Sequence, residues 1–182
     1  MRILLSIFSL LLSSISWSED LLIDNNGKRT IVTEHFYTDK SSFRAFKIEG
    51  SFTDNLGNYG IWDNASTVTL QNNNVINLQG YGKRVFQNNE ITYIKGFRNK
   101  QEQQAGVGKT EVVNASSSLM PLVRMSCTYA VNFYEDNAYL IHKCAITEKQ
   151  KNILQKSVTM QSMMQSGKML LSIVMIEIWN LL

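Results

Sequence analysis

Two segments of alternating apolar residues, joined by a short acidic turn, restrict most strongly what this chain can fold into. Every second residue is apolar or a cysteine over 123–133, and the same period returns over 138–146 with His142 as its polar member. A period of two is typical of a β-strand with one buried face. Because Glu135-Asp136 lies midway between the segments, we predict that they pair as an antiparallel hairpin.

The register of this hairpin places the two cysteines of the chain opposite each other. With residues 135–136 as the turn, Cys127 pairs with Cys144, and Tyr129 pairs with His142. The cysteines then form a non-hydrogen-bonded pair, whose Cα atoms lie about 4.5 Å apart, at the short end of the range for a disulfide. A four-residue loop keeps this register, whereas a three-residue bulged loop would shift the partners by one.

Three further segments have the pattern of short strands. Residues 44–52 alternate strictly, with Phe46 and Phe52 on the apolar face. Residues 59–62 and 90–97 are shorter candidates, rich in aromatic and β-branched side chains. These segments extend the β-rich pattern over most of the chain.

Another hairpin is predicted around Asn72-Asn73-Asn74, between strands 67–70 and 75–78. Asparagine tolerates the left-handed backbone conformation and favours turns. The expected register puts four apolar side chains on one face, in two facing pairs: Leu70 with Ile76, and Val68 with Leu78.

Residues 98–118 interrupt the pattern of strands. The segment is polar and glycine-containing, and we expect a long exposed loop with a short strand at Thr110–Val113. Within it, Gly106–Thr110 matches the last part of a phosphate-binding loop, but Gln103 stands where that motif needs its first glycine. The sequence also lacks the Gly-x-Ser-x-Gly and His-Glu-x-x-His motifs. We therefore expect no catalytic site, and no enzyme.

The first eighteen residues have the features of a secretory signal peptide. Arg2 precedes an apolar run over 3–12, and small residues follow up to Ser18. The run is too short for an uncleaved membrane anchor, since a spanning helix needs about 20 apolar residues. We expect cleavage near Ser18, a periplasmic or secreted protein, and no transmembrane span in the mature chain. The net charge of +3 is too small to indicate nucleic-acid binding.

Export decides how the cysteines are interpreted. Disulfides persist outside the cytosol, so we predict a Cys127–Cys144 disulfide. The alternative is a metal site formed by Cys127, His142 and Cys144, with His35 as a further ligand. No standard zinc spacing is present, and we expect neither a metal nor a cofactor.

Two glycosylation triplets begin at Asn64 and Asn114. An asparagine- and serine-rich chain produces such triplets by chance, and they matter only in a eukaryotic secretory route.

The C-terminal segment 151–182 differs in composition from the rest of the chain. It contains five of the eight methionines and a nearly continuous apolar run over 169–175. Three interpretations remain open: a helix packed on the sheet, a helix that binds a membrane or a partner, and a sequence read out of frame. The β domain is then 19–150.

The sequence therefore predicts a mainly β fold: a small antiparallel barrel, or alternatively a compact sandwich, with a C-terminal helix. The first functional hypothesis is non-catalytic binding of a small, mainly apolar ligand, with residues 98–118 as a lid. The expected lining residues are Phe46, Phe52, Tyr129, Phe133 and His142. The second hypothesis is an envelope or surface module that binds another protein. A cavity of several hundred cubic ångströms would favour the first. A filled barrel with an exposed apolar tail would favour the second.

The facing pair of His142 and Tyr129 allows two interpretations. On an inner face it could serve acid–base chemistry, or it could be a hydrogen-bonded core pair. No carboxylate lies at a spacing that would orient the histidine.

Overall fold

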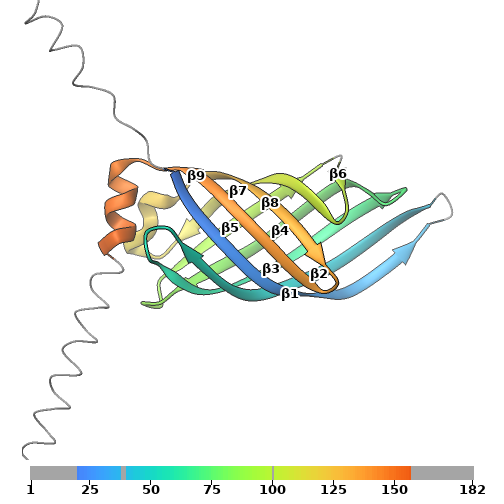
Figure 1. Cartoon of the computed structure of the whole chain (residues 1–182), viewed down its shortest axis with the longest axis horizontal. Coiled ribbons are helices and arrows are strands. Elements are labelled where there is room, and N and C mark those ends of the chain that lie inside the picture. Colours follow the sequence, from blue (N-terminus) through green and yellow to red (C-terminus); the bar gives the residue numbers. More distant parts are fainter. Residues whose placement is uncertain (1–19, 38–39, 100, 157–182) are drawn as a thin grey trace, which may run out of the picture.

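The computed structural model of the chain describes residues 20–37, 40–99 and 101–156 (Figure 1). The predicted signal peptide 1–18 and its cleavage site near Ser18 lie outside the described residues. The tail interpretations concern mostly residues 157–182, which also lie outside them.

One antiparallel sheet closes on itself to form a barrel. The chain order is β1 (Asp20–Phe36), β2 (Ser41–Asp54), β3 (Tyr59–Gln71), β4 (Asn74–Phe86), β5 (Ile91–Arg98), β6 (Gln101–Glu102), β7 (Ala105–Ala115), β8 (Ser126–Tyr134) and β9 (Asn137–Ala145). Neighbouring strands pair antiparallel, β1 pairs with β9, and β6 is a two-residue addition to β4. Eight strands thus form the closed barrel, which confirms the predicted barrel rather than the sandwich.

The interior of the barrel holds the hydrophobic core. Along each strand, buried and exposed side chains alternate, because successive residues point to opposite faces of the sheet. Phe46 and Phe52 are 6% and 2% exposed, as the alternation in 44–52 predicts. An eight-stranded barrel is just wide enough for side chains to fill it or for one small ligand to remain inside.

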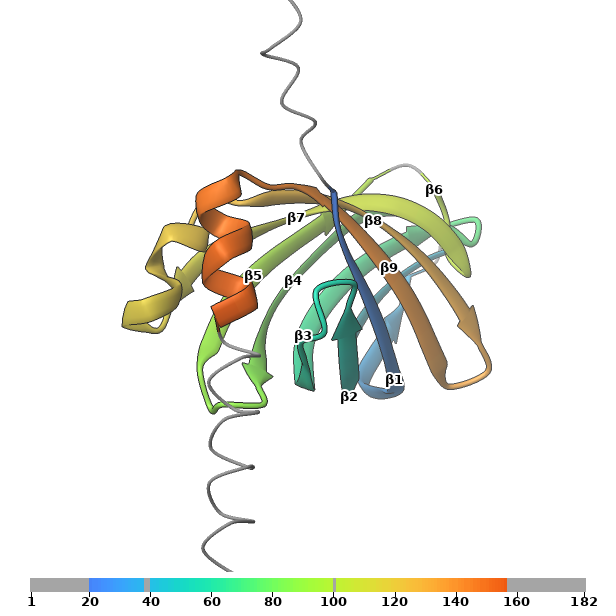
Figure 2. The same cartoon turned by 60° about the vertical axis from the view of Figure 1, so that its left-hand side comes forward.

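One end of the barrel is closed by helical segments. The 3₁₀-helix η1 (Ser117–Leu122) and the helix over residues 148–156 lie together at that end (Figure 2). Leu119, Leu122 and Leu154 are each 1% exposed. The Gln150 side-chain amide donates a hydrogen bond to the Pro121 carbonyl, 3.1 Å away. The predicted C-terminal helix is therefore present, and it begins before the expected boundary at residue 151.

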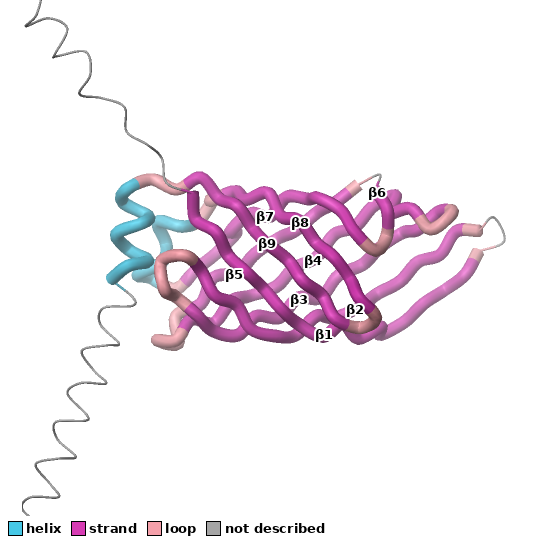
Figure 3. The backbone as a smooth tube through the Cα atoms, viewed as in Figure 1, coloured by secondary structure: helices cyan, strands magenta, loops and turns pink. Residues whose placement is uncertain are grey.

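In the part of the chain that the structure describes, the other end of the barrel carries loops and no helix. Figure 3 shows both helical segments at one end and the β1–β2, β3–β4 and β8–β9 turns toward the other. We call these the helical end and the loop end.

The β8–β9 hairpin has the predicted register. Cys127 pairs with Cys144 and Tyr129 with His142 across a two-residue turn, in which Glu135 has a φ of 53°. The cysteines form a disulfide with a Cα–Cα distance of 4.1 Å. Strand alternation and turn position thus determined the cysteine pairing correctly.

The β3–β4 hairpin confirms one predicted pair and corrects the other. Val68 pairs with Leu78, but a register shift between Thr69 and Leu70 places Leu70 opposite Val75 instead of Ile76. Val75 is fully buried, whereas Ile76 is 43% exposed. The bulge adds one residue on one strand, which alternation alone does not reveal.

The predicted loop at 98–118 is wrong, because most of it is strand β7, which contains and extends the short strand expected at Thr110–Val113. Gly108, Thr110 and Val112 face the interior. Because Gly108 and Thr110 are not large apolar residues, the sequence does not show the apolar alternation of a strand here. A Cβ on Gly108 would lie 2.5 Å from the Tyr129 ring, so the glycine lets that ring pack on β7. The segment is part of the barrel wall and does not form the predicted lid.

Among the described residues, no helix has the length and apolar character needed to cross a membrane.

Candidate functional site

The barrel encloses a cavity of about 50 Å³. Inward side chains from every barrel strand except β1 line it. Four of the five predicted lining residues are among them: Phe46, Tyr129, Phe133 and His142. Phe52 does not line the cavity, because it packs edge-on against Phe86 nearer the helical end, with ring centroids 5.1 Å apart.

A facing pair of glycines contributes to this free space. Gly80 on β4 pairs with Gly96 on β5, and both line the cavity. A Cβ on Gly80 would lie 2.1 Å from Ser66 Oγ, which excludes a side chain there. A Cβ on Gly96 would meet nothing closer than Thr110 Cγ2 at 3.4 Å, an ordinary van der Waals contact. Gly96 is therefore a position where a methyl group would enter the cavity without a clash.

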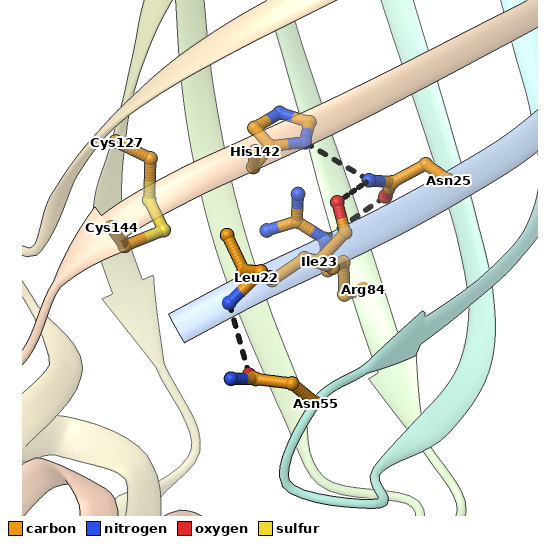
Figure 4. Close-up of a disulfide and its surroundings, with 8 residues drawn as sticks. All are labelled: Leu22, Ile23, Asn25, Asn55, Arg84, Cys127, His142 and Cys144. Atoms are coloured by element: carbon orange, nitrogen blue, oxygen red, sulfur yellow. Dashed lines mark hydrogen bonds between the residues drawn. A yellow bond between two sulfur atoms is a disulfide. The ribbon is translucent and has the colours of Figure 1, made fainter. Parts of the chain in front are cut away.

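His142 is held by a buried amide (Figure 4). The Asn25 side-chain nitrogen lies 2.9 Å from His142 Nδ1, and the Asn25 oxygen accepts a 3.3 Å hydrogen bond from Arg84 Nε. Because an amide nitrogen only donates, His142 Nδ1 is the acceptor and the ring proton lies on Nε2. Burial and the Arg84 charge both hold the pKa of His142 well below its usual range, and a bond with the Ile23 backbone opposes them. The ring is therefore neutral at pH 7.

Arg84 lies on the helical side of this network. It is 2% exposed, and burial lowers its pKa to about 10, with the Asp54 charge acting in the opposite direction. Asp54 accepts hydrogen bonds of 2.9 Å from the Leu56 and Asn58 backbone and from the Asn58 side chain. Burial raises the pKa of Asp54, and these bonds and Arg84 partly offset it. The fold thus supplies Arg84 with an amide acceptor and a nearby carboxylate, and Arg84 Nη2 is left without a hydrogen-bond partner among the described residues.

Arg98 lies toward the loop end, and its surroundings differ. It is also 2% exposed, and it lines the cavity. Its Nη2 donates to the Gln103 carbonyl at 3.2 Å, but Nε and Nη1 have no hydrogen-bond partner among the described residues. Burial lowers the pKa of Arg98, and the neighbouring Tyr129 opposes this shift.

Two more arginines lie beside Arg98. Arg29 and Arg44 line a small extension of about 10 Å³, which shares Phe46, Phe133 and Arg98 with the main cavity. The Arg29 guanidinium stacks over the Phe133 ring, 4.6 Å from its centroid.

In the described part of the chain, two carboxylates act on the arginines at the loop end, Glu34 on Arg44 and Asp136 on Arg29. Arg44 forms an ion pair with Glu34. Arg29 Nη2 donates to the Glu135 carbonyl, and Arg29 Nε is buried with no partner among the residues that the structure describes. Burial and the charge of Arg44 lower the pKa of Arg29, while Asp136 raises it. The inner surface of the loop end is therefore positively charged.

The disulfide argues against the alternative metal site at the two cysteines. Both cysteine sulfurs are bonded to each other, so neither is a free thiolate for the proposed site with His142. His35 lies on the exposed part of β1, and its Nε2 contacts Thr33 Oγ1 at 3.4 Å. Over the described residues, no group of three or more histidine, cysteine or acidic side chains could hold a metal ion.

The two glycosylation triplets lie in different surroundings. Asn64 faces the interior and lines the cavity, next to its hydrogen-bond partner Ser66. Asn114 is exposed near the end of β7. Only Asn114 is accessible to a glycan in the folded barrel.

An open hollow of about 360 Å³ lies against β2, β3 and β4, with Val32 of β1 at its edge. Small residues, Ala45 and Ala65, alternate there with polar ones such as Lys47 and Gln79. Unlike the interior cavity, it is not lined by any of the arginines with unpartnered buried nitrogens.

The buried arginines of the interior were not predicted from the sequence, whereas His142 was. Arg84 shares its strand face with Phe86, and Arg98 shares its face with Ile94, so the period of two does place both arginines inside. Arginine is rarely fully buried, and this makes the correct face harder to choose. A residue two positions away from a buried residue on the same strand faces the interior, whether it is polar or apolar. This rule would have placed both arginines inside the barrel.

The chain matches no protein-family model, and the comparisons with curated proteins and with solved structures find no significant match.

Proposed function

We propose that the protein is an exported, non-catalytic binding protein that holds a small, mainly apolar ligand inside its barrel. The observation that carries the proposal is the interior cavity, whose walls are mostly aliphatic and aromatic with a few polar groups. Ligand sites typically combine apolar walls with a small number of placed polar groups. Phe46, Tyr129, Phe133 and His142 would provide the walls nearest the loop end and the middle of the barrel.

The size of the cavity limits the ligand. One water-sized group needs roughly 10–15 Å³ by this measure, so about 50 Å³ corresponds to roughly three to five non-hydrogen atoms. This is below the several hundred cubic ångströms of a drug-sized site, the volume that was expected to favour ligand binding over protein binding. The proposed ligand is therefore a very small molecule, unless the Phe46 and Phe133 rings move apart.

Export is part of the same proposal. The signal-peptide pattern of residues 1–18 supports it, and the buried disulfide fits an oxidising compartment such as the periplasm or the extracellular space. Mass spectrometry of the exported protein should find a mature start near Glu19.

The alternative remains an envelope or surface module that binds another protein. The hollow against β2–β4 is the feature that favours it, since it is larger than the interior cavity and open.

The experiment that tests ligand binding uses propionamide as a neutral probe of suitable size. Titration followed by amide NMR shifts should give saturable changes at residues lining the cavity. In Gly96→Ala the added methyl occupies part of the cavity. With the probe bound, the methyl and the probe would compete for the same space, and this overpacking of about 1–3 kcal/mol should weaken binding roughly 5- to 150-fold.

Lys95→Ala is the matched control. Lys95 neighbours Gly96 on β5 but points outward, with its ammonium 5.8 Å from the Tyr81 ring centroid. It should leave binding unchanged. If Gly96→Ala binds the probe as tightly as the wild type, the interior cavity is not the site.

A further inference from the structure

We infer that the ligand carries a carboxylate, which Arg98 binds at the loop end of the cavity. This inference rests on the proposed function, because it names the polar part of the ligand that the barrel would hold.

The first argument is the state of the Arg98 side chain. Arginine stays protonated at neutral pH, and Arg98 is 2% exposed. Its Nε and Nη1 atoms have no hydrogen-bond partner in the part of the chain that the structure describes. A buried cation without counter-charge is costly. A carboxylate would satisfy both donors through the parallel pair of hydrogen bonds that a guanidinium forms with it.

The second argument is where these unpartnered donors lie. Arg98 lines both the main cavity and its extension, so its side chain lies at the boundary between the two. The rest of the main cavity is largely apolar, with Phe46, Leu78 and Phe133 close to the shared boundary. This arrangement matches a short molecule with an acidic group at one end and a hydrocarbon part at the other.

The third argument is the balance of charge around the site. Arg29 and Arg44 line the extension beside Arg98, and Glu34 is already paired with Arg44. Glu102, the acidic residue nearest to Arg98 along the chain, is exposed. Asp136 acts on Arg29, so three arginines are offset by two carboxylates, and the remaining positive charge favours an anion over a neutral acceptor.

The cavity volume restricts the anion further. Roughly three to five non-hydrogen atoms fit, which corresponds to a short-chain carboxylic acid and excludes a long fatty acid in this arrangement of the core. The chemical class we assign is therefore a short aliphatic monocarboxylate, with propionate as its probe.

The test compares propionate with propionamide, which has nearly the same shape and no charge. Isothermal titration of the full barrel should show propionate binding roughly tenfold or more tighter than propionamide, because hydrogen bonds to charged groups are the stronger ones. In Arg98→Met this preference should disappear while propionamide binding is kept.

Two further measurements keep the test decisive. Arg98→Met should unfold in urea at no lower concentration than the wild type without ligand, because it removes a buried unpaired charge. If this variant does not fold, Arg98→Lys replaces it: the charge stays but the paired geometry is lost, so the preference should fall.

The outcomes separate the two proposals. Equal affinity for propionate and propionamide would overturn the carboxylate inference and leave the proposed function standing. Binding of neither probe would overturn both. Chloride binding as tightly as propionate would show a plain halide site and also overturn the assigned ligand class.

Discussion

Arg84 and Arg98 are both buried in the same barrel, but their hydrogen-bond partners and neighbouring charges differ. Arg84 donates to Asn25, lies over the Phe52 ring at 5.9 Å from its centroid, and is influenced by the Asp54 carboxylate. Arg98 donates to one backbone carbonyl and has two nitrogens without a partner among the described residues, whereas Arg84 has one, Nη2. Arg84 also does not line the main cavity, whereas Arg98 does.

Arg84 is a buried charge that is bound mainly by groups of the protein itself, whereas Arg98 is a buried charge with donors left for a ligand. The helical side of the barrel surrounds Arg84 with the fold's own groups and closes with apolar helical segments. The loop side leaves Arg98 beside free space and adds Arg29 and Arg44. We therefore expect substitutions on the helical side to change stability, and those on the loop side to change binding.

The largest expected effect is loss of the disulfide on the helical side. Cys127 and Cys144 are 17 residues apart, and removing a crosslink over such a loop costs about 3 kcal/mol in the unfolding free energy. Cys127→Ala/Cys144→Ala should therefore unfold at clearly lower urea than the oxidised wild type.

The reduced wild-type protein is the control for this prediction, because it loses the crosslink without a change in side-chain volume. Both proteins should lose a similar amount of stability. An oxidised wild type no more stable than the reduced one would show that the helical side does not depend on the disulfide.

The second effect is a loss of stability in acid caused by His142. Its folded pKa lies below the usual 6.5 through burial and the Arg84 charge, so the unfolded state binds the proton first as pH falls. Stability should therefore decline below pH 6.5, by about 1.4 kcal/mol per unit, until the folded ring also protonates. Urea unfolding at pH 7.5 and 5.5 measures this slope.

His142→Gln should flatten the slope, and His35→Gln on the exposed part of β1 is the matched control. Asp54 acts in the opposite direction, because its raised pKa adds stability as pH approaches the carboxylate range from above. The measurement is therefore restricted to pH 5.5 and above. An unchanged slope in His142→Gln would mean that the buried network tolerates a charged ring.

Prediction from the sequence succeeded where the apolar period of two was unbroken. It gave the β8–β9 register, the cysteine pairing and the inward faces of Phe46 and Tyr129. It failed in β7, where Gly108 and Thr110 face inward and hide the period. It also did not identify β1 as a strand, because Asn25, rather than an apolar residue, occupies an inward position there.

For the same reason, the aromatic residues and His142 of the candidate site were predicted, but its buried arginines were not. Aromatic residues such as Phe46 and Phe133 indicate which face of a strand is buried. Arginines such as Arg84 and Arg98 are expected on the exposed face, and only the closed barrel shows that they point inward. The bond from Asn25 to His142 joins β1 to β9, the closing strand pair. Local sequence carries no information about which distant strands close a barrel.

The smallest effect should come from Glu34→Gln at the loop end. The Glu34 carboxylate forms an ion pair with Arg44, with Arg44 Nε at 3.0 Å from Oε1, and neutralises part of the positive charge there. Replacing it should cost less than about 1 kcal/mol of stability. The extra net positive charge should strengthen propionate binding roughly two- to fivefold and leave propionamide binding unchanged. Titrations at low and high salt measure this, since the gain should shrink as salt screens the charges. If Glu34→Gln changes the affinity for propionate and for propionamide equally, the substitution acts through the shape of the cavity. The loop side would then differ from the helical side by packing rather than by charge.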